Sequence, residues 1–104
     1  MIGKRYELRI LPLFEDDLNG IVGYITYRLR NPIAAERLVD DVEAAIEDRR
    51  SCAEAFEPYP SCRKRKYPYY RIQVRNFTIF YVVIDGTMEV RRILYSRSNI
   101  RKKI

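Results

Sequence analysis

The chain has 104 residues, the size of a single domain with a core of its own. Its 20 Lys and Arg against 14 Asp and Glu give a formal net charge of +6. This balance favours a nucleic acid or an acidic protein as partner over the alternative of a basic protein with no charged partner. The chain contains no His, which excludes a Ser-His or Cys-His triad and any His general base.

The cysteine count and the length of the hydrophobic runs bear on possible metal sites and on the cellular location. Two Cys without any His cannot form an ordinary zinc site, and we expect neither a metal nor a cofactor. Every apolar run is shorter than the ~20 residues of a membrane span. No apolar stretch of signal-peptide length follows the first residues. We therefore expect a cytoplasmic protein, not bound to a membrane, with Cys52 and Cys62 as free thiols.

A strand and a helix open the chain. Alternating apolar side chains predict a strand from Tyr6 to Leu11, which Pro12 ends. A helix starts around Leu13, and its apolar positions recur every three or four residues, at Phe14, Leu18, Ile21 and Ile25. The two glycines inside this helix, Gly20 and Gly23, weaken it slightly or let a second helix pack closely against it.

The second helix has clear signals at its start. Asn31 suits the N-cap and Pro32 the first helical position, so the helix should run from Ile33 to about Arg49. Its apolar seam consists of Ala35, Leu38, Val42, Ala45 and Ile46. Its outer face is acidic, with Asp40, Asp41, Glu43, Glu47 and Asp48. The short link between the two helices predicts an antiparallel hairpin that lies on a sheet.

An irregular, basic segment separates the helices from the remaining strands. Three prolines break any regular element between Ser51 and Pro68. The run Arg63-Lys64-Arg65-Lys66 in this segment is either a solvated loop or a surface that faces phosphate.

Three strands follow with very short connections. They span Tyr70 to Val74, Phe77 to Ile84 and Met88 to Tyr95. Arg75-Asn76 and Asp85-Gly86 are two-residue turns, in which Asn and Asp-Gly tolerate positive φ. Such turns force antiparallel neighbours, which predicts a meander with the second strand in the centre. That strand is apolar at nearly every position, as expected if both of its faces are covered.

The first strand of the meander alternates, which separates two faces of the sheet. Tyr70, Ile72 and Val74 share the face that should meet the helices, and Arg71, Gln73 and Arg75 share a face that should carry positive charge. The adjacent Arg91 and Arg92 would place one charge on each face unless a β-bulge intervenes.

The order of elements is β-α-α-β-β-β in a single domain over residues 1–104. It predicts an α+β fold with the helical hairpin on one face of a small, mainly antiparallel four-stranded sheet. The position of the first strand in that sheet cannot be derived from the pattern.

The chain resembles the RelE/ParE superfamily of toxins, which includes plasmid stabilisation proteins. In the N-terminal half the similarity rests on Tyr6-x-Leu8 before Pro12, on Asp17-Leu18-x-x-Ile21-x-x-Tyr24-Ile25 and on Asn31-Pro32-x-Ala34-Ala35. In the C-terminal half it rests on Tyr70-Arg71-x-x-Val74-x-Asn76-Phe77-x-Ile79-Phe80-Tyr81-x-Val83 and on Arg92-Ile93-Leu94-Tyr95-x-Arg97-x-Asn99-Ile100. These pieces cover almost the whole chain, and their order and spacing carry the resemblance.

The resemblance implies a toxin of a bacterial type II toxin–antitoxin module, which a cognate antitoxin holds inactive. RelE-like members cut ribosome-bound mRNA, whereas ParE-like members are described as poisoning DNA gyrase, so the shared fold leaves the target open. An antitoxin that is acidic in its wrapping segment would cover the basic sheet face and the tail.

For a nuclease, the resemblance implies Arg71 and Arg97 as phosphate ligands and Tyr95 as proton donor. Gln73 and Thr78, however, stand where further basic residues are expected. Both departures, with the long helical hairpin, favour a ParE-like toxin that binds DNA gyrase and has no catalytic residues.

The alternatives are a RelE-like, metal-independent mRNA interferase and an inactive binding module. Contacts to a target or to phosphate are expected from eight further cations, which are Arg63, Lys64, Arg65, Lys66, Arg75, Arg101, Lys102 and Lys103.

Overall fold

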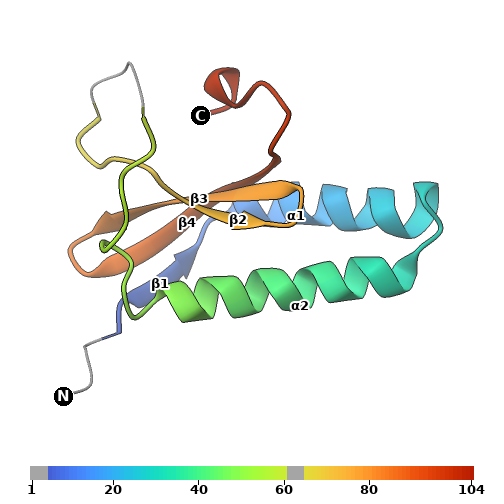
Figure 1. Ribbon diagram of the computed structural model, residues 1–104, viewed down its shortest axis with the longest axis horizontal. Coiled ribbons are helices and arrows are strands. Elements are labelled where there is room, and N and C mark those ends of the chain that lie inside the picture. The colour runs from blue at the N-terminus through green and yellow to red at the C-terminus, as the bar shows by residue number, and fades with distance from the viewer. Residues whose placement is uncertain (1–4, 61–64) are drawn as a thin grey trace.

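The computed structural model describes residues 5–60 and 65–104. Its elements in chain order are β1 (Glu7–Ile10), α1 (Pro12–Gly23), a π-helical turn η1 (Tyr24–Arg28), α2 (Pro32–Arg49), β2 (Tyr70–Val74), β3 (Phe77–Ile84), β4 (Thr87–Tyr95) and a 3₁₀ turn η2 (Ile100–Lys102). Figure 1 shows α2 below the sheet and the C-terminal turn η2 above it, and Tyr59 and Tyr67 of the segment before β2 pack on the same side of the sheet as Ile100. The sheet is therefore covered on both sides.

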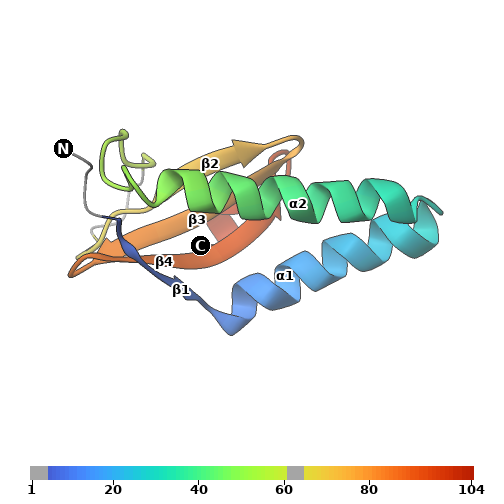
Figure 2. The same ribbon diagram turned by 90° about the horizontal axis from the view of Figure 1, so that it is seen from below.

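The four strands form one sheet in the order β1-β4-β3-β2. β2, β3 and β4 are an antiparallel meander, and β1 pairs in parallel with β4, from Glu7 opposite Thr87 to Ile10 opposite Val90. The predicted α+β fold, the element order and the central position of β3 are confirmed. The place of β1, which the sequence left open, is the sheet edge beside β4 (Figure 2).

The two hairpin turns differ in how they reach positive φ. Asp85 and Gly86 have φ of 48° and 78°, as expected for this dipeptide. In the other turn Arg75 has φ of 53°, whereas Asn76 is not left-handed, so the expectation based on Asn was wrong. The carbonyl of Asn76 accepts the amide of Ser96 at 2.8 Å, which ties this position to the segment after β4.

Both helices start as their sequences indicate. The Oδ1 of Asn31 accepts the amide of Ala34 at 3.1 Å, which confirms the N-cap of α2. α1 begins at Pro12, one residue before the predicted start. The regular helix ends at Gly23 and continues as the π-helical turn η1, which the sequence pattern did not indicate. Arg30, with φ of 51°, reverses the chain before α2.

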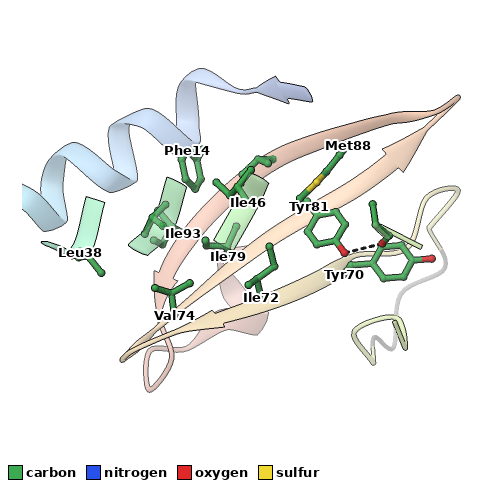
Figure 3. Close-up of a cluster of buried hydrophobic side chains, with 13 residues drawn as sticks. Phe14, Leu38, Ile46, Tyr70, Ile72, Val74, Ile79, Tyr81, Met88 and Ile93 are labelled. Atoms are coloured by element: carbon green, nitrogen blue, oxygen red, sulfur yellow. Dashed lines mark hydrogen bonds between the residues drawn. The ribbon is translucent and has the colours of Figure 1, made fainter. Parts of the chain in front are cut away.

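The main core lies between the helices and the sheet (Figure 3). The helices contribute Phe14, Leu38, Val42 and Ile46, and the facing strands contribute Tyr70, Ile72, Val74, Ile79, Tyr81, Met88, Val90 and Ile93. The predicted apolar seams of both helices are confirmed. Gly20 and Gly23 do not mediate close helix packing, because a Cβ at either position would meet nothing within 4 Å.

The opposite sheet face carries a second apolar cluster. Its buried members are Tyr69, Phe80, Val82 and Leu94, with Tyr59, Tyr67, Ile84, Ile100 and Ile104 packed against them. This face was expected to be mainly positive, and that expectation holds only in part. Aromatic side chains of the irregular segment and isoleucines of the C-terminal turn cover the apolar residues that β3 and β4 present there.

A β-bulge in β4 explains the adjacent arginines. Tyr81 pairs with Val90 and Phe80 with Arg92, which leaves Arg91 as the extra residue. Because strand side chains alternate, this one-residue insertion reverses the face of every later residue in β4.

Candidate functional site

The candidate site is a hollow of about 450 Å³ on the sheet face opposite the helices. We call it the Arg71 pocket. Its lining residues come from β2, from β3 and from the segments on both sides of the meander, namely Tyr59, Arg71, Gln73, Thr78, Phe80, Ser96 and Ile100. The pocket thus lies where the irregular segment and the C-terminal turn meet over β2 and β3.

A neutral hydrogen-bond network forms one wall of the pocket. Gln73 and Thr78 are direct partners across β2 and β3, and Ser96 follows β4. The Gln73 amide donates to the carbonyl of Arg75 at 2.7 Å and to Ser96 Oγ at 2.8 Å. The Thr78 hydroxyl donates to Gln73 Oε1 at 3.1 Å and lies 2.8 Å from Ser96 Oγ.

These contacts use every proton that the three side chains can donate. Gln73 has two amide N–H donors, and Thr78 and Ser96 have one hydroxyl each. Because the Thr78 proton points to Gln73, the Ser96 proton must serve the Ser96–Thr78 contact. The network is therefore saturated, and it offers an incoming anion neither a charge nor a free donor.

Arg71 is the cation that lines the pocket. Its guanidinium carbon lies 5.1 Å from the ring centroid of Tyr59, within the range of a cation–π contact. Its side chain is exposed and pairs with none of the carboxylates of the chain. The residues outside the described ranges contain no Asp or Glu and thus no carboxylate side chain to neutralise it.

A second arginine supports the pocket from behind. Arg49, at the end of α2, donates to the carbonyl of Arg71 at 3.2 Å and to the hydroxyl of Tyr81 at 2.9 Å. That hydroxyl donates to the carbonyl of Ala53 at 2.7 Å, a bond drawn dashed in Figure 3. Burial raises the pKa of Tyr81, and the Arg49 contact opposes this rise without cancelling it. The network ties the irregular segment that carries Tyr59 to the sheet.

Of the three residues expected for a nuclease, Tyr95 is separated from Arg71 by the sheet. Tyr95 pairs with Phe77 on the helix-facing side of the sheet, and their rings meet edge to face at 6.0 Å. It lines a separate groove of about 870 Å³ under α1 and η1, and Arg71 lines the pocket on the other face. Arg97 is exposed and makes no side-chain hydrogen bond or ion pair with the described residues.

The bulge at Arg91 is the reason for this separation. With strict alternation after Val90, Tyr95 would lie on the face of Arg71. The inserted residue moves Tyr95 to the helix side, where it is 45% exposed at the mouth of the groove.

The other expected cations differ in their environments. Arg63 and Lys64 lie outside the described residues. Arg65 and Lys66 stand near the rings of Tyr69 and Tyr67, at 4.8 Å and 5.5 Å from the centroids. Arg75 is paired with Asp41 at 2.7 Å, so its charge is already engaged.

The C-terminal cations are exposed on a turn that is held in place. Arg101, Lys102 and Lys103 have exposed side chains. The Lys103 carbonyl accepts a hydrogen bond from Arg92 at 2.8 Å, while Ile100 and Ile104 pack on the apolar cluster below. The turn therefore presents its charges beside the Arg71 pocket.

Tyr59 and Ser96 are site residues that the sequence reasoning did not find. Tyr59 lies in an irregular segment, where no periodicity assigns a side chain to a face. Ser96 directly follows a strand, and its polar side chain next to Tyr95 was the one available signal. Within residues 5–60 and 65–104, no group of His, Cys, Asp and Glu could hold a metal ion. Cys52 forms no disulfide with the described residues, and Cys62 lies outside them.

Comparison with known proteins identifies the family. The model of the ParE toxin of the type II toxin–antitoxin system parDE matches residues 8–100. The chain belongs to the ParE toxin family. This match confirms the resemblance to the RelE/ParE superfamily and a toxin of a type II toxin–antitoxin system, for which an antitoxin is the implied partner.

A solved structure shows the same fold. The chromosomal ParDE TA system from P. aeruginosa contains a chain that matches with a TM-score of 0.71 at 18% identity. The match covers 88% of this ParE-family chain and 96% of the other. A search of curated proteins gives no match. Among the described residues, no helix combines the length and the hydrophobicity that a membrane crossing requires.

Proposed function

We propose that this ParE-family chain arrests bacterial growth by binding a macromolecular target, with DNA gyrase as the expected target, and that a cognate antitoxin neutralises it. The observation that carries this proposal is the saturated, neutral network of Gln73, Thr78 and Ser96 in the Arg71 pocket. Binding a target needs no catalytic group, so the proposed function requires neither a charge nor a free hydrogen-bond donor from this network.

Cleavage of RNA would require several catalytic groups on this face of the sheet. Attack by a 2′-hydroxyl needs a group that accepts a proton, a group that protonates the leaving oxygen, and cations for the charge that builds up on phosphate. Arg71 supplies one cation, and a guanidinium group, which stays protonated in proteins, is a poor base. Tyr95, the expected proton donor, lies on the other face.

The test compares two activities of one purified preparation. We expect the toxin to inhibit supercoiling by DNA gyrase and to leave mRNA on translating ribosomes intact. Adding the cognate antitoxin should restore supercoiling. Ribosome-dependent mRNA cleavage with normal supercoiling would overturn the proposal.

A RelE-like mRNA interferase is the second candidate, and the unneutralised Arg71 in a hollow of the sheet favours it. This candidate expects Arg71→Ala and Arg97→Ala to abolish growth arrest in proteins that remain folded by circular dichroism. Full toxicity of both variants would exclude this site. Pulse-labelling of protein and DNA synthesis after expression of the chain alone separates both toxins from an inactive relative, which would alter neither.

A further inference from the structure

We propose that the Arg71 pocket receives the carboxylate of an Asp or Glu side chain from an acidic segment of the antitoxin. This inference rests on the proposed function, because it names the chemistry by which the antitoxin engages the toxin. It concerns Arg71, Tyr59 and the rim of cations around the pocket.

Arg71 lines a pocket and has no carboxylate partner. All fourteen Asp and Glu lie in the described residues. The ion pairs they form engage Arg5, Arg9, Arg50, Arg75, Arg91 and Arg92, and none reaches Arg71. A cation that stands in a hollow without a partner is a ready counterpart for an external anion.

The side chain is also held in advance of binding. The Tyr59 ring stacks on the guanidinium at 5.1 Å, and Arg49 bonds the Arg71 backbone carbonyl at 3.2 Å. The Tyr59 ring is itself fixed by an edge-to-face contact with Phe80 at 5.2 Å. Stacking uses the face of a guanidinium and leaves its N–H donors for a planar acceptor. Less side-chain entropy is lost on binding when the geometry already exists.

The donors of the pocket match a carboxylate better than a phosphate. All protons of the Gln73, Thr78 and Ser96 side chains are already donated. Among the lining side chains, those that donate to none of the residues 5–60 and 65–104 are Arg71 and the Tyr59 hydroxyl. One guanidinium satisfies a carboxylate through two parallel hydrogen bonds. The apolar side chains of Phe80 and Ile100 can receive the methylene groups of Asp or Glu.

The rim favours an acidic chain around the inserted side chain. From Val90 to Ile104 the sequence contains six Arg and Lys and no Asp or Glu. Arg97 directly follows the pocket-lining Ser96, Arg101 and Lys102 directly follow the pocket-lining Ile100, and all three cations are exposed. A neutral segment would leave these charges unpaired, whereas further acidic residues would pair with them.

Nuclear magnetic resonance on the ¹⁵N-labelled full chain tests the site directly. The probes are two capped peptides, acetyl-Gly-Leu-Glu-Leu-Gly-amide and the same peptide with Gln in place of Glu. We expect the Glu peptide to shift the Nε–Hε signal of Arg71, and Arg71→Lys assigns that signal by its loss. An equal response to both peptides, or no response to either, would overturn the inference.

Matched variants separate the pocket from general charge. Arg71→Gln should lower the affinity for the Glu peptide at least tenfold. Arg37→Gln removes the same charge from the exposed face of α2 and should leave the affinity unchanged. Tyr59→Ala should weaken binding several-fold, and Tyr59→Phe, which keeps the ring, should restore it. A folded Arg71→Gln protein with wild-type affinity would contradict the proposal.

Two further measurements identify the occupant. Tighter binding of a single-stranded oligonucleotide than of the Glu peptide at Arg71 would overturn the carboxylate site in favour of nucleic acid. In cells that express the Arg71→Gln toxin, restoring growth should take about tenfold more antitoxin than with the wild type. A folded Arg71→Gln variant that no longer arrests growth would show that the pocket binds the target instead of the antitoxin.

The two proposals fail separately, because the supercoiling assay uses the wild-type toxin without any peptide. If supercoiling is normal and the Glu peptide binds at Arg71, gyrase is rejected as the target and the carboxylate site is retained. If supercoiling is inhibited and the peptide does not bind, only the carboxylate site is rejected.

Discussion

At the scale of single residues, Asp17 and Arg92 join three parts of the chain. Arg92 in β4 contacts both carboxylate oxygens of Asp17 in α1, at 2.7 and 2.9 Å. Asp17 also accepts the amide of Ile93 at 3.2 Å, and Arg92 reaches the Lys103 carbonyl of the C-terminal turn. Both side chains are mostly buried, at 13% and 18% exposure, so each depends on the other for its charge.

We expect Asp17→Asn to lower the free energy of unfolding by about 3 kcal/mol, because it leaves a largely buried guanidinium without its counter-charge. Urea denaturation followed by circular dichroism measures the loss. Asp16→Asn is the matched control, since Asp16 is exposed and forms no ion pair with the described residues; its effect should stay within about 0.5 kcal/mol. Equal effects of the two variants would contradict this role of the pair.

Because of Tyr81, the free energy of unfolding should depend on pH in the alkaline range. Its buried hydroxyl bonds Ala53 and Arg49, and burial raises its pKa above the ordinary value of about 10. The folded state therefore holds this proton more tightly than the unfolded state. Stability is complete below pH ~10 and falls as the pH rises toward the folded pKa.

The variant Tyr81→Phe tests both parts of this statement. It should cost about 1–2 kcal/mol at pH 8, because the Ala53 carbonyl and Arg49 lose a buried partner. The decrease of wild-type stability between pH 9 and 11 should be smaller in the variant, since the titrating group is gone. Urea unfolding at several pH values provides the comparison, and identical alkaline slopes would argue against Tyr81 as the source.

At the scale of elements, two glycines with equal free space should respond oppositely to the same change. Gly86→Ala should destabilise the β3–β4 turn by about 1–2 kcal/mol, because φ of 78° is unfavourable for a residue with a Cβ. Gly20→Ala should stabilise α1 by about 0.5–1 kcal/mol, because Ala is the better helix former. Melting temperatures should therefore move in opposite directions, and a shift of the same sign would show that local backbone preference does not decide.

The elements with a strong local signal were predictable from the sequence. The Asn31-Pro32 pair marked the start of α2, and the Asp85-Gly86 pair marked a hairpin. The π-helical turn at Tyr24–Arg28 has no such signature, because its residues continue the helical pattern. The left-handed residue of the other hairpin is Arg75, whose propensity argues against it; contacts with Asp41 and with the Gln73 side chain hold it there.

At the scale of the whole molecule, charge is divided between two sides. The outer face of α2 is acidic, with Asp40, Asp41, Glu43, Glu47 and Asp48 exposed. The C-terminal turn and the Arg71 pocket on the other side of the sheet carry Arg71, Arg97, Arg101, Lys102 and Lys103. An acidic partner would be oriented toward the pocket side during its approach.

Association with the antitoxin should therefore depend on salt. We expect the association rate to fall by about tenfold or more between 50 and 500 mM NaCl, as in other electrostatically steered complexes. Stopped-flow fluorescence with a labelled antitoxin measures this rate, with Arg37→Gln as a variant that keeps the basic side intact. A rate that does not change with salt would show that the charge division has no role in the encounter.

The candidate site was only partly predictable at this scale, for a physical reason. Alternation along β2 placed Arg71 and Gln73 on one face correctly. One inserted residue, Arg91, then reversed the remainder of β4 and carried Tyr95 to the other side of the sheet. The contribution of Tyr59 depends on the tertiary path of an irregular segment, which local sequence does not determine.

The pairing of β1 with β4 also bears on how the protein is made. Glu7 leaves the ribosome eighty positions before Thr87, its partner in the sheet. A nascent chain that has not yet extruded β4 has an unpaired first strand, an open edge on β3, and no Ser96 or Ile100 to close the Arg71 pocket. Translation that stops before β4 therefore yields a fragment without the site, and the finished fold requires synthesis through Ile100.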